Sequence, residues 1–351
     1  MTVGFLDVLI TVLSLVILIV PGYLLAKTGI LGEKADAVLS SLVLYGCQPM
    51  LCFMSFQNTA YSPAIATNML IVAGLAILIH AIMIGLVFLI IPSKNKSSGD
   101  SKAIADETVK ENNNKKLNCL RFASVFSNCG YMGFPFLQSL FGGDPATANE
   151  ILVYGGIVIA IFNVLTWSVG VFMMSGDKKD MSIKNAVLNP VVIAIIIGLI
   201  LFFTVQQPIA TLAPEGTFMG DMLSKLMGSL ESIGNMVTPL SMFVIGVKLS
   251  NTKLKLLVVD KVAYYGSFIK LILMSLVSIL VVSYLPIATI VKYALFFCLS
   301  MPSATGTVMF AVRFGGDSES ASIFVLQSTI LSILTIPLMF MLFSGVFGVI
   351  M

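Results

Sequence analysis

The chain of 351 residues is 58% hydrophobic and only 11% charged, whereas about a quarter of the residues in a soluble globular protein are charged. This composition excludes a soluble globular protein, and the small formal net charge of +3 gives no reason to expect a nucleic-acid partner. Several largely apolar segments run for ~20 residues or more, enough for a helix to cross the ~30 Å hydrocarbon core of a bilayer. The sequence therefore predicts an all-α integral membrane protein.

Taken in chain order, the apolar segments predict ten membrane-spanning helices, at residues 5–26, 35–57, 64–91, 117–141, 149–174, 186–205, 226–249, 258–284, 288–312 and 319–347. The first lacks the charged start and the cleavage site of a signal peptide, so we expect it to be retained. Two polar connectors interrupt the series, at 93–116 and 206–225. The composition of 93–116 indicates a flexible, solvated segment.

The basic residues predict the orientation in the membrane, because cytoplasmic loops are enriched in lysine and arginine. With an extracytoplasmic N-terminus, 17 of the 20 basic residues fall on the cytoplasmic side: Lys27, Lys34, Lys94, Lys96, Lys102, Lys110, Lys115, Lys116, Arg121, Lys178, Lys179, Lys184, Lys248, Lys253, Lys255, Lys261 and Arg313. We therefore expect a multi-pass protein of the cell (inner or plasma) membrane, with both termini extracytoplasmic and loop 93–116 cytoplasmic.

Three landmarks recur in the same order in the two halves of the chain. The sequence Phe-Gly-Gly-Asp occurs at 141–144 and again at 314–317, and at that offset Gly133 matches Gly306. The second and seventh spans carry Gln48-Pro49 and Thr238-Pro239 at corresponding places. Since each half holds five spans, the halves must have opposite orientations. The sequence predicts two inverted five-helix repeats, 1–175 and 176–351, an arrangement found in many secondary transporters.

Two of the predicted spans contain segments that interrupt a helix. Residues 128–135 combine an asparagine, two glycines and a proline, and residues 301–306 combine a proline, two hydroxyl residues and a glycine. Lipid does not tolerate such breaks unless protein or a watery cavity covers the freed backbone groups. Paired broken helices are typical of transporter binding sites, and their half-helix N-termini favour an anion such as a carboxylate. The alternative is a pair of packing kinks.

Several motifs resemble the auxin efflux carrier family, which includes plant auxin exporters and bacterial permeases for malate and malonate. They are Asn128 followed by Met132-Gly133-Phe134-Pro135, Asn189-Pro190 at the start of the sixth span, and Pro239 to Gly246 in the seventh. The resemblance covers essentially the whole chain. The connection after the fifth span is only Ser175 to Asn185, much shorter than the central loop of the plant exporters. The chain therefore resembles a prokaryotic member, and auxin is not transferred as its substrate.

The resemblance implies a fold similar to the bile-acid/sodium symporters and the sodium/proton transporter NhaA. Spans 1, 2, 6 and 7 would form a scaffold, and spans 3–5 and 8–10 a transport core in which spans 4 and 9 cross at their breaks. It also implies a substrate-contacting asparagine at Asn128, crossover prolines at Pro135 and Pro302, and a scaffold residue facing the substrate at Gln48, beside Pro49. A homodimer formed through the scaffold is what relatives of this fold suggest.

These arguments give a set of candidate site residues. Predicted to contact the substrate are Asn128, Gly130, Gly133, Gln48, Ser303, Thr305 and Gly306; predicted to shape the breaks and kinks are Pro135, Pro302, Pro49 and Pro239. For the polar residues the alternative is local hydrogen bonding to a carbonyl freed by the break or, for Gln48 and Thr238, bonding within their own helix. Asp144 and Asp317 are expected to cap the helices that follow them.

Candidates for a coupling role are the ionisable or polar residues inside spans, namely Lys270, His80, Asn163 and Gln327. Each has a simpler alternative. Lys270 could extend to the cytoplasmic interface, His80 could be a hydrogen-bonded core residue, and Asn163, Gln327 and Gln138 could tie helices together. Without a mid-membrane carboxylate, no dedicated sodium cage is recognisable, although carbonyls at the breaks could hold Na⁺ with Asn128 and Thr305. Proton coupling or facilitated exchange is favoured, with the coupling ion left open.

The sequence thus predicts a secondary-active or facilitative carrier for a small organic anion, a carboxylate by preference, that works by elevator-type alternating access at the crossed breaks. The alternative is a transporter-like sensor that binds a ligand and signals to a partner; a fused soluble module would favour it, and we recognise none. No enzyme signature is present. The five cysteines have no metal-ligand spacing and are expected to be small core residues, so no metal or cofactor is predicted. The substrate, the direction of transport and the oligomeric state are not specified.

The orientation is directly testable. A single cysteine at Ser98, within the connector 93–116, is expected to resist an impermeant maleimide in intact cells and to react after lysis, because the basic side faces the cytoplasm. Labelling of intact cells would reverse the proposed topology.

Overall fold

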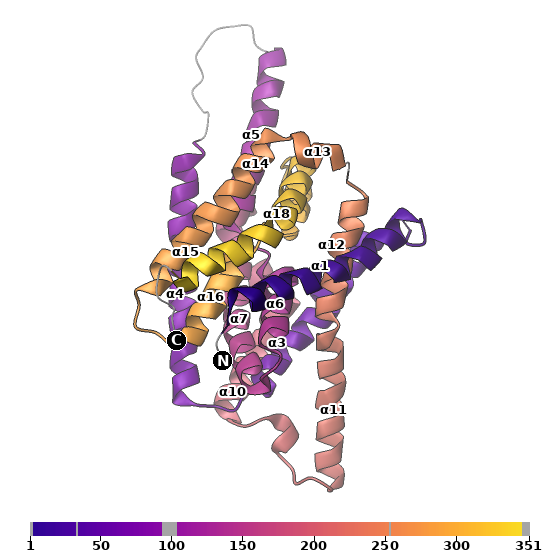
Figure 1. The fold of residues 1–351 in the computed structure, drawn as a ribbon, viewed down its shortest axis with the longest axis vertical. Helices are drawn as coiled ribbons and strands as arrows, with labels where there is room; N and C mark the ends of the chain where they lie inside the picture. The colour runs from indigo at the N-terminus through magenta and orange to yellow at the C-terminus, as the bar shows by residue number, and fades with distance from the viewer. Residues whose placement is uncertain (1–2, 33, 93–103, 253, 346–351) are drawn as a thin grey trace.

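The structure, a computed structural model, describes residues 3–32, 34–92, 104–252 and 254–345 (Figure 1). Every regular element in these ranges is a helix, and the strand-like pairing found there is an isolated antiparallel bridge between Ser127 and Ser303. The predicted all-α class is therefore confirmed. Position 98, chosen above for labelling, lies outside the described residues.

The helices of the first half are α1 (Phe5–Lys27), α2 (Ala35–Ser41), η1 (Leu42–Cys47), α3 (Gln48–Gln57), α4 (Pro63–Ile90), α5 (Ile104–Val125), η2 (Cys129–Gly133), α6 (Phe134–Phe141), α7 (Pro145–Leu165), η3 (Thr166–Gly170) and α8 (Val171–Ser175). The second half forms η4 (Lys178–Asp180), α9 (Ile183–Val187), α10 (Pro190–Thr204), η5 (Ile209–Thr211), α11 (Phe218–Asn235), α12 (Val237–Ser250), α13 (Leu254–Val259), α14 (Lys261–Phe268), η6 (Ile269–Leu273), α15 (Met274–Ser283), α16 (Thr289–Ser300), α17 (Gly306–Arg313) and α18 (Ser318–Gly345).

Seven helices in the described part of the chain are long and apolar enough to cross a membrane: 5–27, 35–57, 63–90, 145–175, 218–250, 261–283 and 318–345. An eighth is counted if the segments 178–187 and 190–204, bent by 46° at a short break, form one span. The chain is thus a multi-pass membrane protein. The fourth and ninth predicted spans are not among these helices because α6 and α17 have 8 residues each, too few to cross alone.

The structure corrects both polar connectors. Residues 104–116, expected to be flexible, belong to helix α5, which extends beyond the rest of the bundle at the end where α4 also ends (Figure 1). The second connector ends early, because α11 begins at Phe218 and runs almost straight into α12 to form a 33-residue helix. In both cases the polar residues form a part of the helix that projects past the apolar segment. A hydropathy pattern does not distinguish such a polar helix from a loop.

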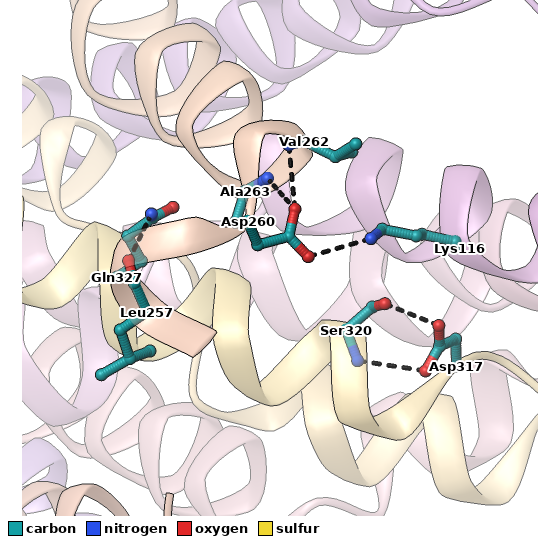
Figure 2. A network of polar contacts seen from close by, with 8 residues as sticks. All are labelled: Lys116, Leu257, Asp260, Val262, Ala263, Asp317, Ser320 and Gln327. Atoms are coloured by element: carbon teal, nitrogen blue, oxygen red, sulfur yellow. Dashed lines mark hydrogen bonds and ion pairs between the residues drawn. The ribbon is translucent and has the colours of Figure 1, made fainter. Parts of the chain in front are cut away.

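An ion pair joins the middle of α5 to the capping residue of α14 (Figure 2). Lys116 Nζ lies 2.9 Å from Asp260 Oδ2, while Asp260 Oδ1 accepts hydrogen bonds from the backbone of Val262 and Ala263 at the start of α14. Partial burial tends to raise the pKa of the Asp260 carboxyl, but Lys116 and the two backbone donors outweigh it, so the pKa lies below its usual value. Asp260 therefore caps α14 as a carboxylate.

Two further aspartates cap helices as the sequence predicts. Asp144 Oδ1 accepts from Ala146 N (3.2 Å) at the start of α7, and Asp317 Oδ1 accepts from Ser320 N (3.0 Å) at the start of α18 (Figure 2). A hydrogen bond from Thr147 is the main reason that the pKa of Asp144 is lowered. Both aspartates of the Phe-Gly-Gly-Asp repeat thus have the same structural role.

Helices α1 and α12 pack with their backbones in direct contact at two glycines. A Cβ atom on Gly22 would lie 2.5 Å from Phe243 O and 2.7 Å from Phe243 Cα, and one on Gly246 would meet Ile19 O and, at 2.6 Å, Tyr23 N. Small residues allow such close approach between membrane helices, where packing provides much of the association energy. Both helices belong to the predicted scaffold, so these glycines hold together the first and seventh spans.

We expect Gly22→Ala to separate α1 from α12, because the obstructing atoms are backbone and cannot move aside. The overpacking is expected to cost about 1–3 kcal/mol and to lower the thermal unfolding temperature of the purified protein in detergent. Gly74→Ala on α4 is the matched control, since a Cβ there meets nothing within 4 Å. Equal unfolding temperatures for the two variants would contradict the close contact.

Candidate functional site

Two non-helical segments lie against each other, and the first is displaced from its predicted place. Of the predicted break 128–135 only Asn128 is non-helical, because Cys129–Gly133 form η2 and Phe134–Phe141 form α6; the second falls within the predicted 301–306. Helix α5 ends at Val125, and the chain continues without helix through 126–128 before η2 and α6. Helix α16 ends at Ser300, and 301–305 are likewise non-helical before α17. The isolated bridge between Ser127 and Ser303 pairs these two non-helical segments. The helix-breaking residues thus bring together parts of the chain about 170 residues apart.

Backbone groups freed by one break are satisfied by the other. Asn128 N donates to Pro302 O (2.7 Å), and Ala304 N donates to Phe126 O (2.9 Å). Buried backbone groups need such partners, above all where no water is available. The role of Pro302 is therefore to end α16 and present its carbonyl to the first break, while Pro135 lies where the π-helical turn η2 passes into α6.

A cavity of about 410 Å³ lies beside the paired breaks. Its wall combines residues from both breaks with residues from η1, α3, α7, η3 and α12, and includes Asp36, Ser40, Tyr45, Gln48, Phe122, Ser127, Asn128, Gly130, Tyr131, Asn163, Thr166, Trp167, Asn189, Lys248, Ala304, Thr305, Gly306, Phe310 and Arg313. Volumes of this order are typical of small-molecule sites. The wall is largely apolar with a few polar groups, which is the usual composition of such sites.

The structure brings six of the predicted site residues to this cavity: Gln48, Asn128, Gly130, Asn163, Thr305 and Gly306. The others lie outside its wall. Ser303 is buried behind the bridge, where its backbone N donates to Ser328 Oγ (3.1 Å). A Cβ on Gly133 would approach Met301 Cγ at 3.3 Å, so Gly133 serves the packing of one break on the other. Pro49, within the first turn of α3, and Pro239, near the start of α12, also lie outside the wall.

Asn128 combines the features expected of a ligand-binding side chain. It lines the cavity, its exposed fraction is 2%, and its amide nitrogen Nδ2 has no hydrogen-bond partner in the described part of the chain. Its backbone is fully engaged, since its N bonds Pro302 and its carbonyl accepts from Met132 N and Gly133 N. A buried donor without an acceptor costs about 1–3 kcal/mol, so a ligand acceptor in the cavity would relieve that cost.

Gly130 and Gln48 face each other across the cavity wall. A Cβ on Gly130 would collide with Gln48 Nε2, and the Gln48 side chain is 97% buried. The glycine therefore makes room for the Gln48 amide to lie over the backbone of the first break. The predicted scaffold and the predicted core meet here, where the Gln48 side chain contacts the break directly because Gly130 has no side chain.

Other polar residues tie helices together. Asn189 Nδ2 donates to Asn163 Oδ1 (3.0 Å), and Asn189 Oδ1 also caps α10 by accepting from Val191 N. Thr238 donates to Gln138 Oε1 (3.0 Å), so it bonds across helices and the alternative of a bond within its own helix is wrong. Away from the cavity, Gln327 donates to Leu257 O (2.8 Å; Figure 2).

Lys270 does not extend to the interface. It is fully buried, and its ammonium donates to Ser127 Oγ (2.9 Å) in the first break and to Leu299 O (3.0 Å) just before the second. Ser127 lines the cavity, so Lys270 lies one residue behind the cavity wall. His80, by contrast, makes the core hydrogen bond given as its alternative, between Nδ1 and Ala76 O (2.7 Å).

Sequence reasoning missed the charged rim of the cavity. Lys248 Nζ lies 3.7 Å from Asp36 Oδ1, and the Arg313 guanidinium lies over the Trp167 ring at 5.2 Å. All four residues line the cavity. Lys248 and Arg313 had been counted only as loop charges. A signal was available, because Lys248 lies at the end of the seventh predicted span and Arg313 directly after the ninth, and these spans contain Thr238-Pro239 and Met301-Pro302.

Four π-helical turns occur in the described residues, and all lie at or next to this site. Three of them supply cavity residues: Tyr45 from η1, Gly130 and Tyr131 from η2, and Thr166 and Trp167 from η3. The fourth, η6, contains Lys270. Such turns are rare and are frequently found at functional sites. They widen the helix locally and turn side chains toward the cavity.

Within the described residues no group of three or more His, Cys, Asp or Glu side chains is placed to hold a metal ion. The cavity instead offers the amide of Asn128, the hydroxyl of Thr305 and the cations of its rim. These groups suit a small molecule with negative charge and hydrogen-bond acceptors.

Comparison with known proteins agrees with this geometry. The profile of the "Membrane transport protein" family matches the chain twice, over residues 7–186 and 178–340. An uncharacterized transporter of Methanothermobacter thermautotrophicus is 24% identical over 335 residues, covering 93% of this chain and 96% of that protein. An uncharacterized transporter of Methanocaldococcus jannaschii is 22% identical over 330 residues, with the same coverage of 93% and 96%.

The contact between Gly130 and Gln48 gives a test of the site. Gly130→Ala is expected to displace the Gln48 amide and impair ligand binding, while the unfolding temperature changes little because a flexible side-chain end can move. Gln48→Ala removes the obstruction, so adding Gly130→Ala to Gln48→Ala should cause much less further loss than in the wild type. Additive losses in this double-mutant cycle would show that the two residues do not act through their contact.

Proposed function

Because this chain belongs to the membrane transport protein family, the auxin efflux carrier family that its motifs resemble, we propose that it is a secondary carrier for a small organic anion, most simply a carboxylate. It binds this anion in the cavity beside the two helix breaks. The observation that carries the proposal is Asn128, a buried amide donor without a partner that lines a cavity of about 410 Å³ built from both breaks.

The charges around the cavity favour an anion. Lys270 lies behind Ser127, and Lys248 and Arg313 belong to the rim, whereas Asp36, a carboxylate of the wall, is paired with Lys248. The short helix α17 begins at Gly306, which also lines the cavity, and a helix N-terminus carries roughly half an elementary positive charge. A monoanion, or a dicarboxylate with one group still solvated, matches this charge better than a fully buried dianion.

We propose that the broken segments α5–η2–α6 and α16–α17 are the fourth and ninth of ten spans and that they cross at the bridge between Ser127 and Ser303. Spans 1, 2, 6 and 7 form the scaffold in this proposal, and the remaining spans form the moving core. Supporting it, the cavity wall combines Gln48 and Lys248 from the proposed scaffold with Asn128 and Thr305 from the proposed core. A site at such a boundary becomes accessible from one side and then the other when the core slides.

The cavity wall includes charged residues at one end of the molecule. Asp36, Lys248 and Arg313 lie at the ends of helices that face the basic side of the predicted topology. In the proposed mechanism this conformation is open to the cytoplasm. On the opposite side Gln138 of α6 is bonded to Asn235 and Thr238 of the long helix α11–α12, contacts between core and scaffold that would have to break when the site opens outward. The scaffold-mediated homodimer stays a prediction.

Counterflow in proteoliposomes tests the transport proposal. Vesicles loaded with an unlabelled carboxylate are expected to accumulate the same labelled compound, and a panel of lactate, pyruvate, malonate and malate, with choline and an amino acid as controls, identifies the class. Accumulation of choline or of the zwitterionic amino acid, with none of the four organic anions, would contradict an organic-anion carrier.

Asn128→Ala is expected to weaken binding of the transported carboxylate by about 1.5–3 kcal/mol, the range for a hydrogen bond to a charged group, or about 10- to 150-fold in Kd. The unfolding temperature should change little, because the backbone bonds of Asn128 remain. Asn68→Ala is the control: Asn68 Nδ2 bonds Tyr154 (3.1 Å) and lies outside the cavity wall. Unchanged affinity in Asn128→Ala would remove Asn128 from the site.

A further inference from the structure

Lys270 is the least expected side chain in this structure. It lies in the π-helical turn η6, in the middle of the membrane-spanning segment 261–283, and its exposed fraction is 0%. A charged group inside a membrane protein is costly and is retained where it has partners and a function. The hydrogen-bond partners of its ammonium are two oxygens, Ser127 Oγ and Leu299 O.

These two oxygens belong to the two breaks. Leu299 is the penultimate residue of α16, so its carbonyl is one of the last four that receive no hydrogen bond from an N–H donor within the helix. The C-terminal end of a helix also carries roughly half an elementary negative charge. Ser127 Oγ itself donates to Leu299 O (2.9 Å), so the hydroxyl, the carbonyl and the ammonium form a closed group.

A cation is the expected occupant of such a position. In carriers with broken helices, unwound carbonyls and half-helix C-terminal ends are the groups that coordinate Na⁺ or bind H⁺. Here the described residues show no carboxylate bonded to Lys270. The ionisable groups that interact with it are His80 on α4 and Cys129 in η2. The partial negative charge of the two oxygens is thus offset by the positive charge of the Lys270 ammonium.

We propose that Lys270 is a built-in cation that occupies the ion position at the paired breaks, so that the breaks are charge-balanced without a bound metal ion. Lys270 is a positioning residue: it holds Ser127 and the end of α16 in place, and it contributes positive charge behind the cavity wall. The consequence for transport is that the carrier does not require sodium, and this consequence rests on the proposed function. That the ammonium occupies the ion position does not depend on the proposed function.

A built-in cation differs from a purely structural lysine in one measurable way. Lys270→Ala removes the lysine side chain and leaves a space lined by Ser127 Oγ and Leu299 O. A small free cation can then replace the ammonium there. Lys270→Met removes the charge but fills the space, so it leaves no room for an ion. Lys292→Ala is a matched control, since Lys292 also bonds a backbone carbonyl, Ser283 O (3.1 Å), but lies far along α16 from the break.

The test is thermal unfolding of the purified proteins in sodium chloride or methylammonium chloride against choline chloride at equal ionic strength. Lys270→Ala is expected to unfold at a lower temperature than wild type. Sodium or methylammonium should raise its unfolding temperature by about 2 °C or more, because a cation that binds the folded state stabilises it. Wild type, Lys270→Met and Lys292→Ala should show no such selective rise.

Two outcomes would overturn the proposal: a wild-type protein stabilised selectively by sodium, or a Lys270→Ala protein that responds no more than Lys270→Met. If Lys270→Ala does not survive purification in choline, its yield of folded protein in methylammonium decides, and equal yields in both salts count against the proposal. The readout needs no substrate. Failure of all carboxylates in counterflow would therefore disprove the proposed function and leave the cation result standing.

Discussion

The fold depends on one contact, the pairing of two non-helical segments inside the bundle. Phe126 to Asn128 and Met301 to Ala304 exchange the backbone hydrogen bonds Asn128 N to Pro302 O and Ala304 N to Phe126 O. Neither break is stable alone in an apolar environment, because its backbone groups would lack partners. Each break therefore needs the other to satisfy its backbone hydrogen bonds. The cavity, the free amide of Asn128 and the position of Lys270 all follow from their pairing.

The helices around this pairing are adapted in a consistent way. Rigid contact is concentrated away from it, at Gly22 and Gly246, where the backbones of α1 and α12 touch. Around the cavity the helices η1, η2, η3 and η6 have π-helical turns, and the contact of Gly130 with Gln48 leaves no side chain of the break between the two parts. The close-packed pair belongs to the proposed scaffold; of the four π-helical turns, η2, η3 and η6 belong to the proposed core and η1 to the scaffold side of the cavity.

Much of this arrangement could be predicted from the sequence, for identifiable reasons. The second break was visible because Pro302 cannot continue a helix, whereas the first was located only approximately, since Gly130, Gly133 and Pro135 lie in η2 and α6 and the non-helical segment precedes them. Asn128 and Thr305 lie in the non-helical segments and line the cavity. The α-helical class follows from the apolar segments. The helical continuation of α5 and α11 beyond those segments was not predicted, because polar residues form solvated helix as readily as loop. The count of ten spans stays a prediction.

The residues that the sequence did not identify are those whose role depends on a distant partner. Whether Lys270 points outward or inward is decided by the π-helical turn that contains it and by oxygens 143 and 29 residues away in the chain. The ion pair between Asp36 and Lys248 joins the start of one span to the end of another. A single sequence carries no record of such long-range pairing, whereas the local breakers Pro and Gly act on their own neighbours.

The buried charge of Lys270 also bears on the electrical energetics of the proposed carrier. Moving one elementary charge through 100 mV changes the free energy by about 2.3 kcal/mol, and Lys270 lies in the part proposed to move. A monoanion bound in the cavity would offset the charge of this ammonium, whereas in the empty core that charge is not offset by a bound anion. The membrane potential, negative inside, then acts on the empty core and draws it toward the cytoplasm. A resting cell would thus hold the empty site of the proposed carrier facing the cytoplasm.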